Sequence, residues 1–169
     1  AMTTLDPRLP LVQNADLDGK VVLVRLDHNV VKKGVVKDPY RIDRTIGTLY
    51  SIVERGGRPI LMTHIGRPRD KKTGAIRCDA ADGVEAIVAY LEQKLHARFF
   101  VPQMTPDGER GILGIDTSIN LAVRELRARR FGGIYLPNIR WFAGEETDGP
   151  ARAAFARQLA GLADVFVND

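Results

Sequence analysis

Two apolar stretches, each running into a cluster of polar residues, constrain the fold of this chain more than any other feature. They are Val21–Asn29 (VVLVRLDHN) and Pro59–Pro68 (PILMTHIGRP). A near-continuous apolar run is typical of a strand covered on both faces of a sheet. A helical segment lies between the two runs, so the unit is strand–helix–strand and the strands are expected to be parallel. Their carboxyl ends then share the sheet edge at which open α/β sheets bind ligands.

The rest of the chain continues this alternation of strands and helices. Apolar spacing predicts helices that begin at Asp38-Pro39, Val84, Ile119 and Asp148-Gly149-Pro150. Further strands are predicted over Arg98–Val101, Ile134–Ile139 and Val165–Val167, and a loop over Val30–Lys37. The pattern indicates a three-layer α/β fold, with an open, parallel, Rossmann-like sheet of at least five strands and helices on both faces.

The predicted domain organisation is one α/β domain over residues 21–169, preceded by an irregular arm over residues 1–20. A parallel strand normally leads into a loop and a covering helix, and none follows Val165–Val167. We therefore expect the domain to be incomplete and the chain to be a fragment of a longer protein.

Composition excludes several classes of protein without choosing a function. The formal charge is +4, from 25 Lys and Arg against 21 Asp and Glu, which suits an anionic small molecule as well as nucleic acid. The basic stretch Arg124–Arg130 has no interleaved aromatic residues, so we expect no nucleic-acid partner. No apolar run approaches the roughly 20 residues that span a bilayer. The single cysteine, Cys78, excludes an intrachain disulfide and indicates a reducing, cytoplasmic location.

Polar side chains with the chemistry to bind an anion follow several predicted strands. Arg67 and Arg140, with Arg41 from a helix start, can make bidentate contacts to phosphate or carboxylate. His64 can donate to the same anion, and Gly66 lets the backbone come close to it.

Carboxylate and amide groups at strand ends would bind hydroxyl groups instead. Asp27 and Asn29 suit this role, although Asp27 could merely cap a turn. For Asn168 and Asp169 a structural and a binding role are equally open. The set predicts a small, hydroxylated, multiply anionic ligand. No G-x-x-x-x-G-K-[ST] or G-x-G-x-x-G phosphate loop and no H-E-x-x-H motif is present.

At these residues the chain resembles the N-terminal domain of phosphoglycerate kinase. The most specific match is Thr63–Pro68, which fits the family signature S/T-H-x-G-R-P. The other matches are Arg25–Asn29 (R-x-D-x-N), Asp38–Ile42 (D-x-x-R-I), Asn138–Trp141 (N-x-R-[FW]) with Gly144–Glu146 (G-E-E), and Leu159–Asp169. The sequence departs from the family at His28, which replaces a usual Phe, at Val30-Val31 and at Pro137.

The resemblance implies a glycolytic enzyme that transfers a phosphoryl group reversibly between 1,3-bisphosphoglycerate and ADP. It implies a substrate site for 3-phosphoglycerate made of Asp27, His28, Asn29, Arg41, His64, Ile65, Gly66, Arg67 and Arg140. Within it Arg41 is the expected catalytic residue, beside the transferred group.

The resemblance places Mg²⁺ with ATP or ADP on a C-terminal domain that is absent from this sequence. We therefore expect no cofactor or metal site within this chain, and we expect the fragment alone to be inactive. The alternative is a non-catalytic module that diverged from the kinase and binds a phosphoglycerate-like anion.

Overall fold

The fold is a parallel sheet between two layers of helices, which confirms the predicted α/β class. The computed structural model describes residues 3–4, 17–145 and 149–169. Its sheet has six strands in the order β1-β8-β2-β5-β7-β6, all parallel. The strands are β1 (Thr3–Thr4), β2 (Val21–Arg25), β5 (Arg58–Met62), β6 (Phe99–Phe100), β7 (Gly133–Tyr135) and β8 (Val165–Asn168). The helices are α1 (Pro39–Glu54), α2 (Glu85–Leu95), α3 (Ile119–Arg127) and α4 (Pro150–Leu162).

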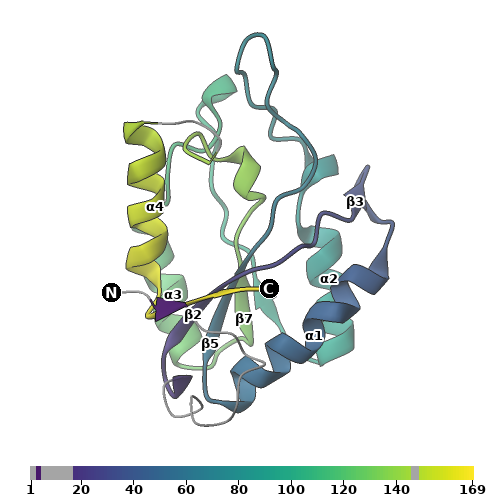
Figure 1. Ribbon diagram of the computed structural model, residues 1–169, viewed down its shortest axis with the longest axis vertical. Helices are drawn as coiled ribbons and strands as arrows, with labels where there is room; N and C mark the ends of the chain where they lie inside the picture. Colours follow the sequence, from purple (N-terminus) through teal and green to yellow (C-terminus); the bar gives the residue numbers. More distant parts are fainter. Residues whose placement is uncertain (1–2, 5–16, 146–148) are drawn as a thin grey trace.

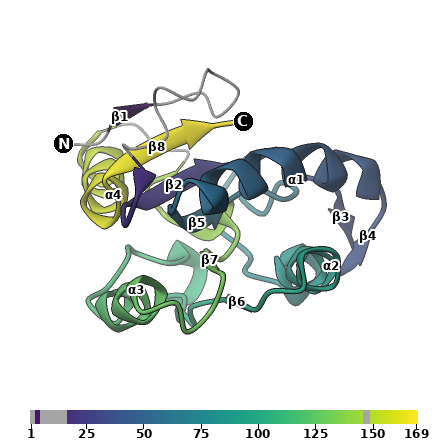
Figure 2. The same cartoon turned by 90° about the horizontal axis from the view of Figure 1, so that it is seen from below.

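The sheet separates two apolar layers, and successive residues of β2 alternate between them. Val22 and Val24 pack with the buried residues of α1 and α2, while Val21 and Leu23 pack with those of α3 and α4. Figure 2 shows the two helix pairs on opposite sides of the sheet. The period of two along a strand causes this division, and burial on both faces explains the continuous apolar run.

Crossover connections bring the central strands into one parallel set. β2 pairs with β5 from Val21↔Arg58 to Arg25↔Met62, and β8 pairs with β2 on its other side. The carboxyl ends of these strands therefore lie at one edge of the sheet, as predicted. The long loop between β5 and α2 extends from this edge (Figure 1). Among the helices that the structure describes, none is both long enough and apolar enough for a membrane crossing.

The segment predicted as a loop over Val30–Lys37 contains a small β-hairpin instead. β3 (Val31–Lys32) pairs antiparallel with β4 (Val35–Val36), so two residues form the turn. Both turn residues, Lys33 and Gly34, have positive φ angles of 53° and 75°. Such a pair of left-handed residues matches the right-handed twist of a hairpin. Glycine adopts this conformation freely in loops and hairpin turns alike, so Gly34 alone does not distinguish a hairpin from a loop.

Two further differences concern the ends of the predicted strands. The predicted strand Ile134–Ile139 is wrong in length, because β7 ends at Tyr135 and η4 (Ile139–Trp141) is a 3₁₀ helix. Pro137 has no backbone N–H for the sheet, which explains the early end. In the predicted irregular arm, Thr3–Thr4 pairs with β8 as the edge strand β1. Residues 5–16 of the arm lie outside the described part.

Candidate functional site

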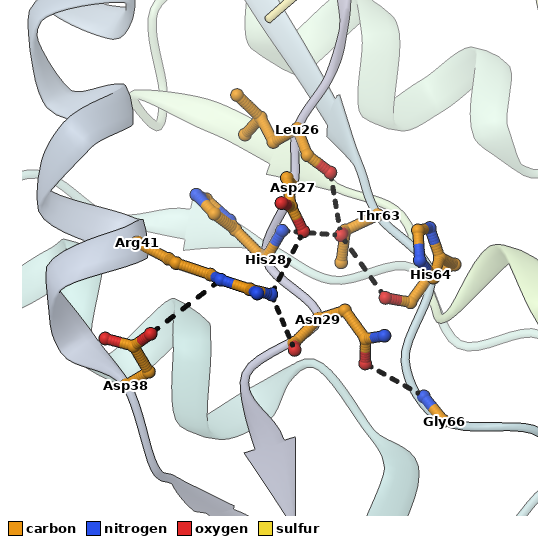
Figure 3. Close-up of polar contacts among 9 residues, drawn as sticks. All are labelled: Leu26, Asp27, His28, Asn29, Asp38, Arg41, Thr63, His64 and Gly66. Carbon is orange, nitrogen blue, oxygen red and sulfur yellow. Dashed lines mark hydrogen bonds and ion pairs between the residues drawn. The ribbon is translucent and has the colours of Figure 1, made fainter.

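Thr63 joins the chain segments that leave the carboxyl ends of β2 and β5. Its Oγ1 accepts a hydrogen bond from the backbone N–H of His28 at 3.0 Å and donates one to the carbonyl of Leu26 at 2.8 Å. Leu26 also donates to the carbonyl of Met62 at 2.9 Å. These bonds continue the pairing of the two strands beyond the sheet, and they fix the backbone of Asp27 at the edge (Figure 3).

Arg41, in the first turn of α1, faces the segment that follows β2. Its Nη1 lies 3.6 Å from Asp27 Oδ1 and 3.5 Å from the carbonyl oxygen of Asn29, and its Nε lies 3.7 Å from Asp38 Oδ2. Figure 3 shows the guanidinium reaching across to these residues. The Arg41 and Asp27 side chains are 45% and 63% exposed, so these long contacts contribute little stability. An anionic ligand can replace them at small cost.

Asp38 begins α1 as predicted, but its side chain makes no capping hydrogen bond to the helix backbone. The ion pair with Arg41 takes its place. Pro39 occupies the first turn of the helix, where its missing N–H leaves no hydrogen bond unmade.

A second group of contacts connects Asn29 to the far side of the site. Asn29 Oδ1 accepts the backbone N–H of Gly66 at 3.1 Å, and Arg140 donates through Nη1 to the Gly66 carbonyl. Gly66 has a φ of +62°, and an added Cβ would lie 3.1 Å from Asp82 Oδ1. A larger residue would therefore be strained at this position. The contacts place Arg41, Asn29, Gly66 and Arg140 in one continuous set.

Asn138 fixes the loop after β5 from behind. It is fully buried, and its Oδ1 accepts from the backbone N–H groups of Ile65 at 3.0 Å and Arg140 at 3.1 Å. Its Nδ2 donates to the carbonyls of Ile65 at 2.8 Å and Asp82 at 3.1 Å. One amide thus satisfies both polar groups of the Ile65 backbone and starts the turn that carries Arg140.

Two cavities lie beside these residues. One, of about 340 Å³, is lined by Asp27, Arg41, Arg44, Thr45, Thr48 and Asp169. The other, of about 700 Å³, lies along the loop after β5, and its lining includes Arg67, Arg77 and Asp82. The structure therefore places Arg41 and Arg67 on different cavities.

Two of the predicted substrate-binding residues lie behind the site. The side chains of His28 and Ile65 are fully buried. The backbone N–H of His28 is bonded to Thr63, and both polar backbone groups of Ile65 are bonded to Asn138. Their binding role remains a prediction. Arg67 is exposed and His64 half-buried, and His64 lies on the other side of Asn29 from Arg41 in Figure 3.

Several residues that shape the site were not predicted from the sequence. Arg44, Thr45 and Thr48 line the smaller cavity together with Arg41. They follow Arg41 at intervals of three, four and seven along α1, which is the spacing of one helix face. Arg41 was recognised, so this spacing is the signal that could have found them. Thr63 and Asn138 lie within the family motifs, but the sequence does not show that they hold the backbone of the site.

Burial shifts the pKa of two groups around the site. It lowers the pKa of His28 from 6.5 to about 4, and the nearby charge of Asp27 opposes the shift. It also raises the pKa of Asp82, and Asp79 adds to this rise while Arg77 opposes it. Within the described ranges, no group of three or more His, Cys, Asp or Glu side chains is arranged to hold a metal ion.

Comparison with known proteins gives the same family as the sequence motifs. The family described as "Phosphoglycerate kinase" matches residues 12–169. The phosphoglycerate kinase of Wolbachia sp. subsp. Brugia malayi is 33% identical over 163 residues, and the match covers 95% of this chain and 35% of that protein. That of Rubrobacter xylanophilus is 36% identical over 160 residues, covering 94% and 35%.

Solved structures show the same fold. Phosphoglycerate kinase from Coxiella burnetii superposes with a TM-score of 0.66 at 21% identity, covering 100% of this chain and 35% of that one. The enzyme from Pyrococcus horikoshii gives a TM-score of 0.61 at 19% identity. This chain thus spans about a third of the length of these relatives. Its fold, its motifs and the match over residues 12–169 show that it belongs to the phosphoglycerate kinase family, as an N-terminal domain.

Proposed function

We propose that the carboxyl edge of the sheet binds 3-phosphoglycerate, and that the chain is the substrate-binding part of a phosphoglycerate kinase. The complete enzyme would transfer a phosphoryl group reversibly between 1,3-bisphosphoglycerate and ADP in the cytoplasm. The observation that carries this proposal is the continuous set of contacts from Arg41 through Asn29 and Gly66 to Arg140, in a chain of this family.

The chemistry of the edge suits a ligand with an anion at each end and a hydroxyl between. Asp27 and Asn29, in the segment that follows β2, would bind the glycerate hydroxyl. Arg67, with His64 and Arg140, would hold the fixed phosphate. Arg67 is exposed, so the ligand would displace water from its guanidinium.

Arg41 would neutralise the carboxyl end, where the phosphoryl group is transferred. Phosphoryl transfer depends mainly on positioning and on stabilising charge, with little covalent assistance from the protein. A guanidinium beside the reacting group supplies such stabilisation. Its loose contacts with Asp27 and Asp38 hold it near this position before the ligand arrives.

The described residues do not fit a site for magnesium, since no suitable cluster of ligands is present among them. We assign the Mg²⁺ complex of ATP or ADP to a part of the enzyme outside this sequence.

Isothermal titration calorimetry of the chain with 3-phosphoglycerate tests the proposal. We expect weak binding that weakens further as salt is added, because exposed charge contacts are screened. Glycerol at the same concentration, which lacks both anionic groups, should give no heat. Absence of heat with millimolar 3-phosphoglycerate at low ionic strength would count against the proposal.

A further inference from the structure

A buried chain of hydrogen bonds behind the site joins β7 to α1 through the imidazole of His28. Tyr135 Oη lies 2.7 Å from His28 Nδ1, and His28 Nε2 lies 2.8 Å from Thr45 Oγ1. Thr45 Oγ1 in turn donates to the carbonyl of Ile42 at 2.7 Å. Tyr135 and His28 are fully buried and Thr45 is 5% exposed. These hydrogen bonds therefore lie in the protein interior, whereas the contacts of Arg41 are exposed to solvent.

The partners of each atom fix the direction of every hydrogen bond. Thr45 uses its only proton on the Ile42 carbonyl, so its oxygen must accept from His28 Nε2–H. His28 Nδ1 is then the unprotonated nitrogen of a neutral imidazole, and it accepts from the Tyr135 hydroxyl. A second proton on the ring, at Nδ1, would face the Tyr135 oxygen, and the Tyr135 hydroxyl could then no longer donate to His28. The chain is therefore satisfied by the neutral Nε2–H tautomer alone.

His28 and Thr45 connect two segments that contribute residues to the proposed ligand site, the segment after β2 and the first turns of α1. His28 lies between Asp27 and Asn29 in the sequence, and Thr63 also holds its backbone. Thr45 is one helical turn beyond Arg41 and lines the same cavity as Asp27 and Arg41. The imidazole thus sets how the first turns of α1 lie against the segment that follows β2.

We propose that His28 is a positioning residue, which holds Arg41 opposite Asp27 and Asn29 through its hydrogen bonds to Tyr135 and Thr45. Its role in ligand binding rests on the proposed function. Burial lowers the pKa of His28 to about 4, so the ring is neutral at physiological pH, as the hydrogen-bond directions require. The imidazole itself does not contact the ligand and acts through Arg41.

The tautomer can be measured without any ligand. Long-range ¹H–¹⁵N NMR correlations of the imidazole should show a protonated Nε2 and an unprotonated Nδ1 at pH 7. A charged ring, or the Nδ1–H tautomer, would overturn the proposal. This measurement keeps its meaning if 3-phosphoglycerate does not bind and the proposed function fails.

Removal of one hydroxyl tests the positioning role. Tyr135→Phe keeps the buried ring but removes the donor to His28. Tyr90→Phe is the matched control, because the Tyr90 hydroxyl also bonds to α1, at Asp43 and 2.6 Å away, but in a solvent-exposed position. We expect Tyr135→Phe to weaken 3-phosphoglycerate binding on the order of 3- to 30-fold, with the protein still folded, and Tyr90→Phe to leave binding unchanged.

Two results would overturn the positioning role. Equal losses in both variants would mean that any contact to α1 has this effect. A lower melting temperature for Tyr135→Phe with unchanged affinity would mean that the chain only stabilises the fold. If the unmodified chain does not bind, the backbone amide shifts of Asp27, Asn29 and Arg41 still decide, since they should move in Tyr135→Phe and stay in place in Tyr90→Phe.

Discussion

At the scale of single residues, the candidate site depends on what surrounds each charged group and less on how many there are. The chain has 25 basic residues, and most lone arginines are solvated. Arg41 differs because it faces Asp27 and the Asn29 carbonyl across the strand edge. Arg67 differs because it is exposed and lines the larger cavity. Each can therefore give up solvent or a weak contact for a ligand anion.

Replacing Arg67 tests the assignment of the fixed phosphate. We expect Arg67→Ala to reduce the affinity for 3-phosphoglycerate by about 1.5–3 kcal/mol, the usual cost of losing a charged hydrogen bond, or roughly 10- to 150-fold. Arg157→Ala is the control, since it removes an equal charge from an exposed position on α4. Calorimetry on both variants decides. An equal loss for Arg157→Ala would mean that only net charge attracts the ligand.

The buried imidazole of His28 predicts a loss of stability in mild acid. Its pKa is about 4 in the folded protein and about 6.5 in the unfolded chain, so the unfolded chain binds the proton first. The contribution of the neutral His28 to the free energy of unfolding is then fully present above pH 6.5. It is lost as the pH drops toward 4, by up to about 3 kcal/mol. Asp27, the charged neighbour, raises the pKa and limits the loss.

Urea unfolding of the unmodified chain and of His28→Phe, measured from pH 7 to pH 4, checks this contribution. Carboxylates titrate in both proteins, so the difference between the two curves isolates His28. We expect the unmodified chain to lose stability more steeply over this range. Parallel curves would show that the folded protein accepts the proton on His28 without cost.

At the scale of the elements, the sequence predicted the order of strands and helices well and their ends less well. The strands β2 and β5 have continuous apolar runs because both faces of the sheet are buried. β7 was predicted too long because its apolar run continues through Leu136 and Ile139, both of which are buried outside the strand. These residues are apolar because they are buried, although they lie outside the strand, so the apolar pattern does not show where β7 ends.

The same limit applies to the residues of the site. Convergence of Asp27, Asn29, Arg41 and Gly66 at one edge followed from the strand–helix–strand pattern. The burial of His28 could not be predicted from this pattern, because a histidine among polar residues at a strand end also suits a ligand contact. Its partner Tyr135 lies 107 residues further along the chain, and only the folded sheet brings the two together.

Replacing Asn138 tests how strongly the loop after β5 depends on one buried amide. Asn138→Ala removes the partners of Ile65 and of the turn at Arg140, and leaves buried backbone groups unsatisfied. We expect a loss of about 2–4 kcal/mol in the free energy of unfolding. Asn120→Ala, at an exposed position of α3, should change it by less than about 0.5 kcal/mol. Chemical denaturation measures the free energy of unfolding of both variants. Similar, small changes in the two would show that the loop does not depend on the Asn138 amide.

At the scale of the whole molecule, the proposed function gives the described domain one reactant, at the carboxyl edge of its sheet. The domain covers 35% of the length of the kinases it resembles. In the proposed reaction a second reactant, with its metal ion, must be brought in line with the first. Holding both reactants can supply about 7–11 kcal/mol of the barrier, which a domain that binds only one of them cannot provide.

We therefore expect the purified chain alone to show no phosphoryl transfer from ATP to 3-phosphoglycerate in the presence of magnesium. A coupled spectrophotometric assay should give the background rate of the buffer. A full-length kinase of the family, added in trace amount, serves as the positive control. Activity that remains with this chain through successive purification steps would reveal a nucleotide site within it, and would contradict the division of roles proposed here.

NMR mapping tests most directly whether 3-phosphoglycerate binds at the carboxyl edge of the sheet. A ¹⁵N-labelled chain is titrated with the ligand at low ionic strength, and the backbone amide shifts are followed. We predict the largest changes at Asp27, Asn29, Gly66 and Arg140, with Gly19 and Gly56 at the opposite edge unchanged. No changes at millimolar ligand, or changes gathered around Gly19 and Gly56, would contradict the account.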